Sequence, residues 1–519
     1  MKLELIKKTT SVFILCLIFL VSSGAAFARE GICGYEGGIS SGEAAGQTVL
    51  NYQEVSFITG EPVVLKGTVT VKKQQRQGKT TTTYLYSLSN TEKSATLTRT
   101  LVFTTESVET ANGQISETAS LARPATETVK IGSTTYTLRR TNGYEFTRSN
   151  LIDPQPAVNY HAGSIWSRKV YQEGAAADGN TVTVECSGTY YGYDQYWGNA
   201  ESLLLDYVIT GESYGNENGD ESADKWGGTA KVAISSTSAE RLNYQENAPD
   251  QISFPGGYVQ TRENSSILEY TCILPEFDAK GISTDNMIKY KDSLKLETFP
   301  TQKRLPTVND SSFRGHPAEE DLRIMFGLEI FQNYGSDFNP DLLMTRAEFA
   351  GALVQAGREV PEDPALAKNI RIVTNRRNQK EEVVSPYDDV SITNKYFNGI
   401  KSAYDRGMLD GDGYNHFKPN GYITRADAIV AFIRLLGFES LAPAPVAVTG
   451  FRDNDRIPGY ARNAAYVARK IGILQGDERG NMNPTEQLTK GEAATLFNKL
   501  ILYMQDGIKK DYRERLVNY

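Results

Sequence analysis

The sequence predicts a multidomain protein in which an all-β region, an antiparallel sandwich or barrel-like sheet, precedes an all-α region of repeated helical units. Two observations predict this order. Apolar and polar residues alternate in short runs across residues 31–300, and the apolar period changes from two to about 3.6 beyond residue 316. A chain of 519 residues is long enough for several such domains.

Residues 1–28 have the pattern of a secretory signal peptide. Basic residues precede an apolar run from Ser11 to Val21, and small residues follow up to Ala28. An uncleaved membrane anchor is the alternative, but the run is short for a bilayer span. Cys16 also lacks the preceding small residues that lipidation needs. We therefore expect cleavage after Ala28, export, and no membrane insertion of the mature chain.

The region from 31 to 300 is rich in Thr, Ser, Tyr, Val and Gly, and it predicts antiparallel strands. Alternating runs such as Thr80–Leu88 and Ala95–Thr104 are separated by turn dipeptides such as Asn112-Gly113. Many strands at this spacing predict a sandwich or a barrel-like sheet, with two subdomains as one arrangement. No helix is expected here.

This region shows little sign of catalysis. His161 is its only histidine, and the usual motifs of nucleophilic, zinc and phosphate sites are absent. A glycosidase pair of carboxylates has no sequence spacing of its own, so an enzyme remains an alternative. Trp197 and Trp226 could stack on sugar, but core and cross-strand positions are the simpler interpretation. The net charge of -8 without a long basic run argues against nucleic acid as a partner.

No cofactor is expected. The acidic loop Asn216–Asp224 could bind calcium through oxygen ligands, but it lacks the EF-hand spacing, and a solvated loop is the simpler interpretation. The mature chain keeps Cys33, Cys186 and Cys272. Two alternatives remain open: a Cys186–Cys272 disulfide that leaves one free thiol, or three buried thiols. No C-x-x-C spacing supports zinc or redox chemistry.

Three similar helical units follow a proline-containing linker. In the second, a helix face around Ile400 leads to Gly407 at the C-terminal cap, a Gly/Asp turn and Pro419. The interval from Gly472 to Pro484 repeats this arrangement. The predicted boundaries are a signal peptide at 1–28, a β-rich region at 31–300, a linker at 301–316, units at 317–358, 387–438 and 451–505, an insert at 359–386, a second linker at 439–450 and a solvated charged tail at 506–519.

A four-residue box begins the second helix of each unit. It reads Thr345-Arg346-Ala347-Glu348, Thr424-Arg425-Ala426-Asp427 and Thr489-Lys490-Gly491-Glu492. The threonine and the acid predict a capping box, of which Asp427 makes a weaker version. The cation at the first helical position opposes the helix dipole by roughly 0.3–1 kcal/mol. It either pairs with a local carboxylate, points to solvent, or helps the helix N-terminus bind an anion, and the residues leave these alternatives open.

The unit resembles an S-layer homology repeat over roughly residues 316–505. Tyr387-Asp388-Asp389-Val390 and Phe451-Arg452-Asp453 match the opening motif of that family, which the first unit lacks. The resemblance implies a pseudo-three-fold helical bundle that binds secondary cell-wall polysaccharide, commonly with pyruvylated sugars, in grooves between repeats.

By this resemblance the cations contact the glycan and the Asp/Gly loops line the grooves. The first unit has Gln332-Asn333 where the second has Asp410-Gly411, so we expect the second unit to hold the strongest site, then the third. The candidate contacts are Arg346 and Glu348 in the first unit, Asp410, Gly411, Thr424, Arg425 and Asp427 in the second, and Gly476, Asp477, Thr489, Lys490 and Glu492 in the third.

Three functions follow for an exported protein of the cell wall or surface layer. The first is a non-enzymatic surface protein whose β region self-associates or is displayed. The second is a wall-anchored enzyme acting on polysaccharide, and the third is an adhesin or receptor on the same anchor. Self-assembly, a cleft with two carboxyls, and ligand binding without turnover would distinguish them.

Overall fold

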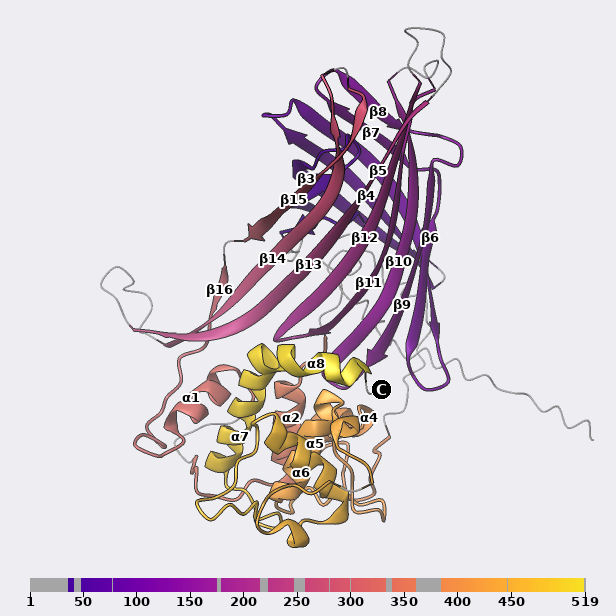
Figure 1. The fold of residues 1–519 in the computed structure, drawn as a ribbon. Coiled ribbons are helices and arrows are strands. Elements are labelled where there is room, and N and C mark those ends of the chain that lie inside the picture. The colour runs from indigo at the N-terminus through magenta and orange to yellow at the C-terminus, as the bar shows by residue number, and fades with distance from the viewer. Residues whose placement is uncertain are drawn as a thin grey trace, which may run out of the picture.

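The computed structural model describes residues 36–41, 48–76, 78–174, 179–214, 223–246, 257–279, 281–298, 300–332, 338–360, 384–445 and 447–517. An all-β N-terminal part stands on a helical C-terminal part (Figure 1). None of the helices in these ranges is long and apolar enough to cross a lipid bilayer.

The β region is one sheet of sixteen strands, and every pairing in it is antiparallel. The strands are β1 (Ile39–Ser40), β2 (Val49–Ser56), β3 (Val63–Arg76), β4 (Lys79–Asn90), β5 (Ala95–Glu109), β6 (Ile115–Leu121), β7 (Thr126–Ile131), β8 (Thr134–Leu138), β9 (Tyr144–Pro154), β10 (Val158–Glu173), β11 (Thr181–Gln195), β12 (Gly198–Tyr214), β13 (Ala223–Gln245), β14 (Gly257–Phe277), β15 (Ser283–Glu297) and β16 (Thr301–Arg304). Most neighbours in the sheet are also neighbours in sequence, as expected for strands joined by short turns.

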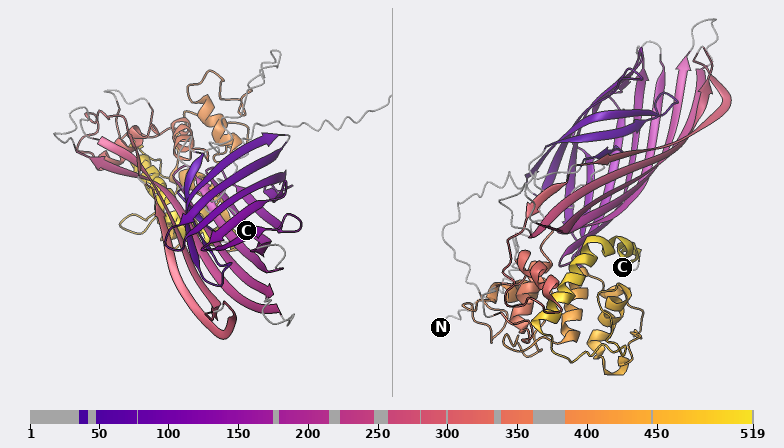
Figure 2. Two further views of the ribbon diagram at one scale, coloured as in Figure 1. Left: turned by 90° about the horizontal axis from the view of Figure 1, so that it is seen from above. Right: turned by 90° about the vertical axis from the view of Figure 1, so that its left-hand side faces the viewer.

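The sheet curls on itself, so that one face becomes the core (Figure 2). Near the ends of the path, Ser266 Oγ of β14 donates a hydrogen bond to the Ser40 carbonyl of β1 at 3.3 Å. Along β4, the buried Tyr84 and Tyr86 alternate with more exposed residues. The alternation predicted from the sequence is therefore correct, and it builds one curled sheet instead of two stacked sheets.

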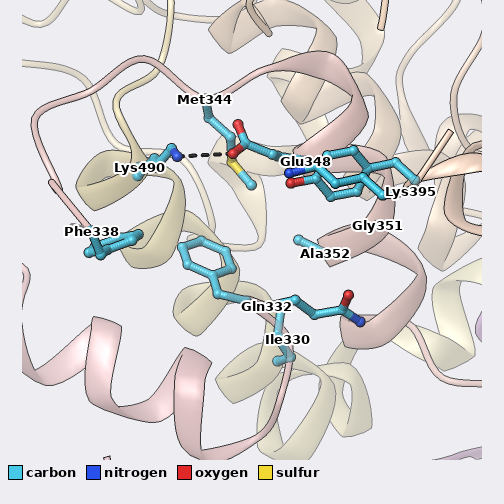
Figure 3. A pocket seen from close by; sticks show the side chains of 11 residues that line it. Ile330, Gln332, Phe338, Met344, Glu348, Gly351, Ala352, Lys395 and Lys490 are labelled. Atoms are coloured by element: carbon cyan, nitrogen blue, oxygen red, sulfur yellow. Dashed lines mark hydrogen bonds and ion pairs between the residues drawn. The ribbon is translucent and has the colours of Figure 1, made fainter. Parts of the chain in front are cut away.

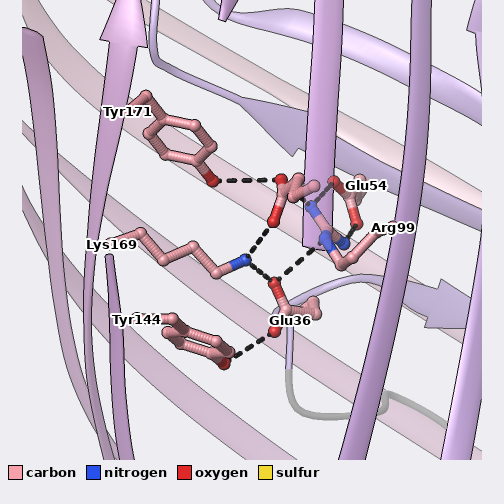
Figure 4. Close-up of polar contacts among 7 residues, drawn as sticks. Glu36, Glu54, Arg99, Tyr144, Lys169 and Tyr171 are labelled. Carbon is pink, nitrogen blue, oxygen red and sulfur yellow. Dashed lines mark hydrogen bonds and ion pairs between the residues drawn. The ribbon is translucent and has the colours of Figure 1, made fainter. Parts of the chain in front are cut away.

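A cluster of buried charges lies inside this curl (Figure 4). Arg99 of β5 lies 2.8 Å from carboxylate oxygens of both Glu54 and Glu127. Lys169 of β10 lies 2.9 Å from Glu127 and also contacts Glu36. Burial acts to raise the pKa of Glu127, but Arg99 and Lys169 lower it to about 2. These ion pairs connect strands that are far apart in sequence, and each buried charge lies next to one of opposite sign.

Both tryptophans expected in the core are buried, Trp197 fully and Trp226 at 9% exposure. Cys186 and Cys272 are free, buried thiols, so the disulfide alternative is wrong. Cys33 lies outside the described residues. So does most of the predicted calcium loop, of which Asp224 is described and accepts a hydrogen bond from Ser283 Oγ at 2.9 Å.

The helical part contains α1 (Glu319–Gly327), α2 (Arg346–Ala356), α4 (Phe397–Asp405), α5 (Arg425–Leu436), α6 (Gly459–Lys470), α7 (Lys490–Leu502) and α8 (Ile508–Val517), with short helices at Glu439–Leu441, Asn454–Arg456 and Tyr503–Gly507. The second helix of each unit packs on the first helix of another: α2 on α4, α5 on α6 and α7 on α1. Gly407 has a φ of 64° after α4, as its predicted capping position requires. Most of the predicted insert lies outside the described residues.

Three backbone hydrogen bonds close a ring at the residues that precede the boxes. Met344 N donates to Leu488 O at 2.9 Å, Leu488 N donates to Ile423 O at 3.1 Å, and Ile423 N donates to Met344 O at 3.1 Å. All three side chains are buried. The three helix starts are therefore held next to one another, although they are distant in sequence.

The end of the sheet and the helical part share one hydrophobic core. Tyr160 Oη donates to the Leu436 carbonyl at 2.8 Å, and Trp197 Nε1 donates to the Ala356 carbonyl at 2.9 Å. Helix α8 lies at this junction, directly beneath the strand ends (Figure 1). The expectation of a solvated tail is wrong for its inner face, because Tyr512 and Arg515 are only 4% exposed.

Candidate functional site

The three boxes begin α2, α5 and α7 as predicted. In the first and third, the threonine accepts from the backbone N–H of the acid, and the acid accepts from the backbone N–H of the threonine. Glu348 and Glu492 are long enough for this return bond, at 2.9 Å in both cases. In the second box Asp427 N donates to Thr424 Oγ1, while the shorter Asp427 carboxylate turns to Arg346 and Tyr460.

Each cation pairs with the acid of a different unit. Arg346 lies 3.2 Å from Asp427, Arg425 lies 3.1 Å from Glu492, and Lys490 lies 2.9 Å from Glu348. The ion pairs join the first unit to the second, the second to the third and the third to the first. The helix pairs α2–α4, α5–α6 and α7–α1 join the units in the same cyclic order. Part of the dipole penalty is thereby offset, by a carboxylate that is not local in sequence.

Because of this exchange, each groove combines residues of different units. Arg346 donates to the carbonyls of Asp410 and Phe417, at 2.6 and 2.9 Å. Asp410 and Gly411 therefore lie with Arg346 and Asp427, and the cation of their own box, Arg425, does not belong to this groove. The predicted order of sites ranks single units, but each groove contains residues of more than one unit, so that order cannot be applied to the grooves.

The first groove, which we name groove 1/2, is a cavity of about 520 Å³. Its three cations are all paired: Arg346 with Asp427, Lys418 with Asp412 at 3.1 Å, and Arg434 with Asp410 at 2.5 Å. It is lined by Arg346, Met408, Leu409, Asp410, Gly411, Asp412, Phe417, Lys418, Tyr422, Asp427, Val430, Arg434 and Tyr460.

The second groove, groove 3/1, is a cavity of about 250 Å³ around Lys490 and Glu348 (Figure 3). Its walls combine apolar and polar groups and include the rings of Phe338 and Tyr396, with Lys395 at the opposite side from Lys490. The full lining is Ile330, Phe331, Gln332, Phe338, Met344, Glu348, Gly351, Ala352, Lys395, Tyr396 and Lys490.

The third groove, groove 2/3, is named for the surroundings of Arg425, where one arginine meets two carboxylates. Arg425 lies 2.8 Å from Glu486 and 3.1 Å from Glu492. The arginine here already has two carboxylate partners.

The Asp/Gly loops have a structural role of their own. A Cβ on Gly411 would lie 2.5 Å from the His416 carbonyl oxygen, and one on Gly476 would lie 3.0 Å from Gly480. Asp477 accepts from the backbone N–H groups of Arg479 and Asn481, so its carboxylate closes its own turn. Glycine and aspartate at these positions therefore shape the loops.

The aspartates of the opening motif fix the strand-like segments before the second and third boxes. Asp389 accepts from Phe417 N and Lys418 N, at 2.8 and 2.7 Å. Asp453 does the same for Met482 N and Asn483 N. The motif thus positions the chain that leads into the helix start.

In the first unit, Phe313 lies in the stretch expected as a linker. It is 2% exposed and packs against Phe326 and Phe338, with ring centroids 5.7 and 6.0 Å apart. Tyr387 packs on Phe417 in the same way, at 5.3 Å. An aromatic residue therefore opens the first unit too.

Sequence reasoning missed Arg434, Lys418, Tyr460, Lys395 and Tyr396 as groove residues. Tyr460 and Tyr396 each lie near the start of a first helix, and this shared position was a signal that the sequence offered. Lys395, Lys418 and Arg434 had no such signal, because each reaches its groove only through the way the units pack.

Three stretches of the chain, residues 313–350, 386–429 and 450–494, match the family model of the S-layer homology domain. The chain contains three S-layer homology domains. This domain implies attachment at the cell surface, and proteins that carry it generally bind secondary cell-wall polysaccharide.

Several curated proteins are similar to part of the chain. An amylopullulanase of Thermoanaerobacterium thermosulfurigenes is 29% identical over 170 residues, 32% of this chain and 8% of that protein. An exoglucanase XynX of Acetivibrio thermocellus is 26% identical over 204 residues, 38% of this chain and 16% of that protein. A surface-layer 125 kDa protein of Lysinibacillus sphaericus is 23% identical over 138 residues, 26% of this chain and 11% of that protein. The alignments thus span a small part of each relative.

Glu348 is expected to make the stability of the fold depend on pH. Burial acts to raise its pKa, but hydrogen bonds from Thr345 and Lys490 outweigh burial and hold the pKa below its ordinary value of 4.5. A carboxyl with a depressed pKa stabilises the fold above 4.5, and this contribution is lost as the pH falls through the folded-state pKa. We expect the melting temperature of the wild-type protein to fall more steeply with acid than that of Glu348→Gln. A difference between the two that does not change with pH would contradict this.

Proposed function

We propose that this is an exported protein held non-covalently at the cell wall by its S-layer homology domains, which display the curled sheet at the surface. The observation that carries the proposal is the set of grooves in which a cation at a helix N-terminus faces a cavity between units. The ring of backbone hydrogen bonds and the cyclic ion pairs support a pseudo-three-fold bundle as its anchor.

The ligand we propose is a secondary wall polysaccharide with pyruvylated sugars. A pyruvate ketal adds a carboxylate to a sugar ring, and a charge-assisted hydrogen bond to lysine or arginine is the interaction such a group needs. Groove walls that combine aromatic faces with cations suit a ring that bears an acid. The candidate contacts are the three cations, their partner acids and the loops at Asp410-Gly411 and Gly476-Asp477.

For the curled sheet we propose a display or surface-layer role, with self-association among the copies. Its clustered carboxylates, Glu36, Glu54 and Glu127, are 5% exposed or less and are bound to Arg99 and Lys169. This burial favours a structural role for the cluster over a glycosidase pair, which needs access for a sugar and water. The wall-anchored enzyme is the alternative that the names of two relatives suggest.

Sedimentation with purified cell walls tests the proposal. The full mature chain is used, because the helical part shares its core with the sheet. It should sediment with walls that retain their secondary polysaccharide and remain in solution with walls stripped of it. Equal sedimentation with both kinds of wall would contradict a polysaccharide anchor.

A further inference from the structure

The three grooves differ in how completely their cations are neutralised. In groove 1/2 three cations meet three carboxylates, one each. In groove 2/3 a single arginine, Arg425, contacts two carboxylates. In groove 3/1 Lys490 contacts one carboxylate, Glu348, and Lys395 is a second lining cation. Of the two grooves that form a described cavity, groove 3/1 carries more positive than negative lining groups and groove 1/2 carries equal numbers.

Lys395 reaches this groove because two helices pack unusually closely. A Cβ on Gly399 of α4 would lie 2.9 Å from the Cα of Gly351 in α2, so only glycine permits this contact. The contact brings the residues just before α4 to the cavity wall formed by α2. Lys395 Nζ lies 4.6 Å from the centroid of the Tyr396 ring. No carboxylate in the described part of the chain pairs with it.

We infer that groove 3/1 is the principal anion site, in which Lys490 and Lys395 hold the acidic group of a sugar between them. This inference rests on the proposed function and deepens it. Phe338 and Tyr396 provide apolar faces for the C–H side of the ring, and Glu348 accepts from a ring hydroxyl or keeps Lys490 oriented. This site therefore contains residues of all three units. Most of its wall belongs to the first unit, which has the poorest match to the family motif.

The reason is electrostatic. An anion entering groove 1/2 or 2/3 must displace a carboxylate from its cation or share that cation with it. An anion entering groove 3/1 shares Lys490 with Glu348 in the same way, but it also meets Lys395, an amino group that has no carboxylate partner in the described chain. Lys395 is a specificity-determining residue in this account, because a neutral sugar gains nothing from it.

The test compares two lysines of the same region in the full mature chain. Lys395→Gln removes the proposed contact, and Lys401→Gln is the matched control, because Lys401 lies on α4 and pairs only with the nearby Asp405. The readout is the affinity for released, soluble wall polysaccharide. We expect Lys395→Gln to weaken binding about tenfold or more, as for loss of a hydrogen bond to a charged group. Lys401→Gln should bind as the wild type does.

A second arm uses polysaccharide treated with mild acid, which releases ketal-linked pyruvate. The wild type should then bind at least as weakly as Lys395→Gln binds the untreated polymer, and the two proteins should no longer differ. If the wild type binds untreated polymer while Lys395→Gln and Lys401→Gln bind equally well, the inference is wrong and the proposed function stands. If acid treatment leaves the effect of Lys395→Gln intact, the acidic group is not a ketal carboxylate. Absence of any wild-type binding would instead contradict the proposed function.

Discussion

Replacing Arg99 with methionine is expected to destabilise the mature protein by about 3–5 kcal/mol, the typical cost of removing one partner from a buried ion pair. Arg99 is 4% exposed and makes two hydrogen bonds of 2.8 Å to Glu54 and one to Glu127. Without it, Glu54 would lose the cation to which it is bound, and Lys169 would remain with Glu36 and Glu127. Urea unfolding followed by circular dichroism measures the change.

The matched control is Arg168→Met on β10. Arg168 is 35% exposed and pairs with Glu145 and Glu185 on the surface of the same sheet. Exposed pairs of this kind contribute about 0–1 kcal/mol, so the control should unfold almost as the wild type does. A loss at Arg99 no larger than that at Arg168 would show that the buried cluster does not hold the sheet together.

Replacing Trp197 with alanine is expected to cost about 3–5 kcal/mol, as for other fully buried tryptophans. Trp197 lies in the turn between β11 and β12, has no exposed surface, and donates to the Ala356 carbonyl at the end of α2. Because it belongs to the core that both parts share, its loss should weaken the sheet and the helices together.

The measurement is thermal unfolding followed separately by far-ultraviolet signals of helix and of strand. We expect both signals to shift to lower temperature in Trp197→Ala. The control, Trp166→Ala, removes a tryptophan that is 38% exposed on β10, and surface changes of this kind usually stay within about 0.5 kcal/mol. A shift of only one signal in Trp197→Ala would contradict the shared core.

The local parts of this structure could be predicted from sequence, because their causes are local. Thr345 and Glu348 are three residues apart, and that spacing suffices for a capping box. Asp427 was expected to cap more weakly, and its carboxylate indeed turns elsewhere. Alternation along Thr80–Leu88 likewise predicted a strand, which is β4 in the structure.

The remaining features depend on which segments meet. Nothing near Arg346 in sequence indicates that its partner is Asp427, which belongs to another unit. The burial of Tyr512 depends on the sheet end that covers α8, and the sequence of the charged tail alone therefore predicts a solvated helix end. Lys395 became a groove residue only through the close approach of Gly351 and Gly399.

The central claim is that the helix-start cations hold the wall polymer, and calorimetric titration of soluble, released polymer tests it most directly. The mature wild type is compared with a triple variant, Arg346→Gln, Arg425→Gln and Lys490→Gln, whose circular dichroism must match the wild type. The account predicts saturable binding by the wild type and no detectable binding by the triple variant. Binding of equal affinity by a correctly folded triple variant would contradict it.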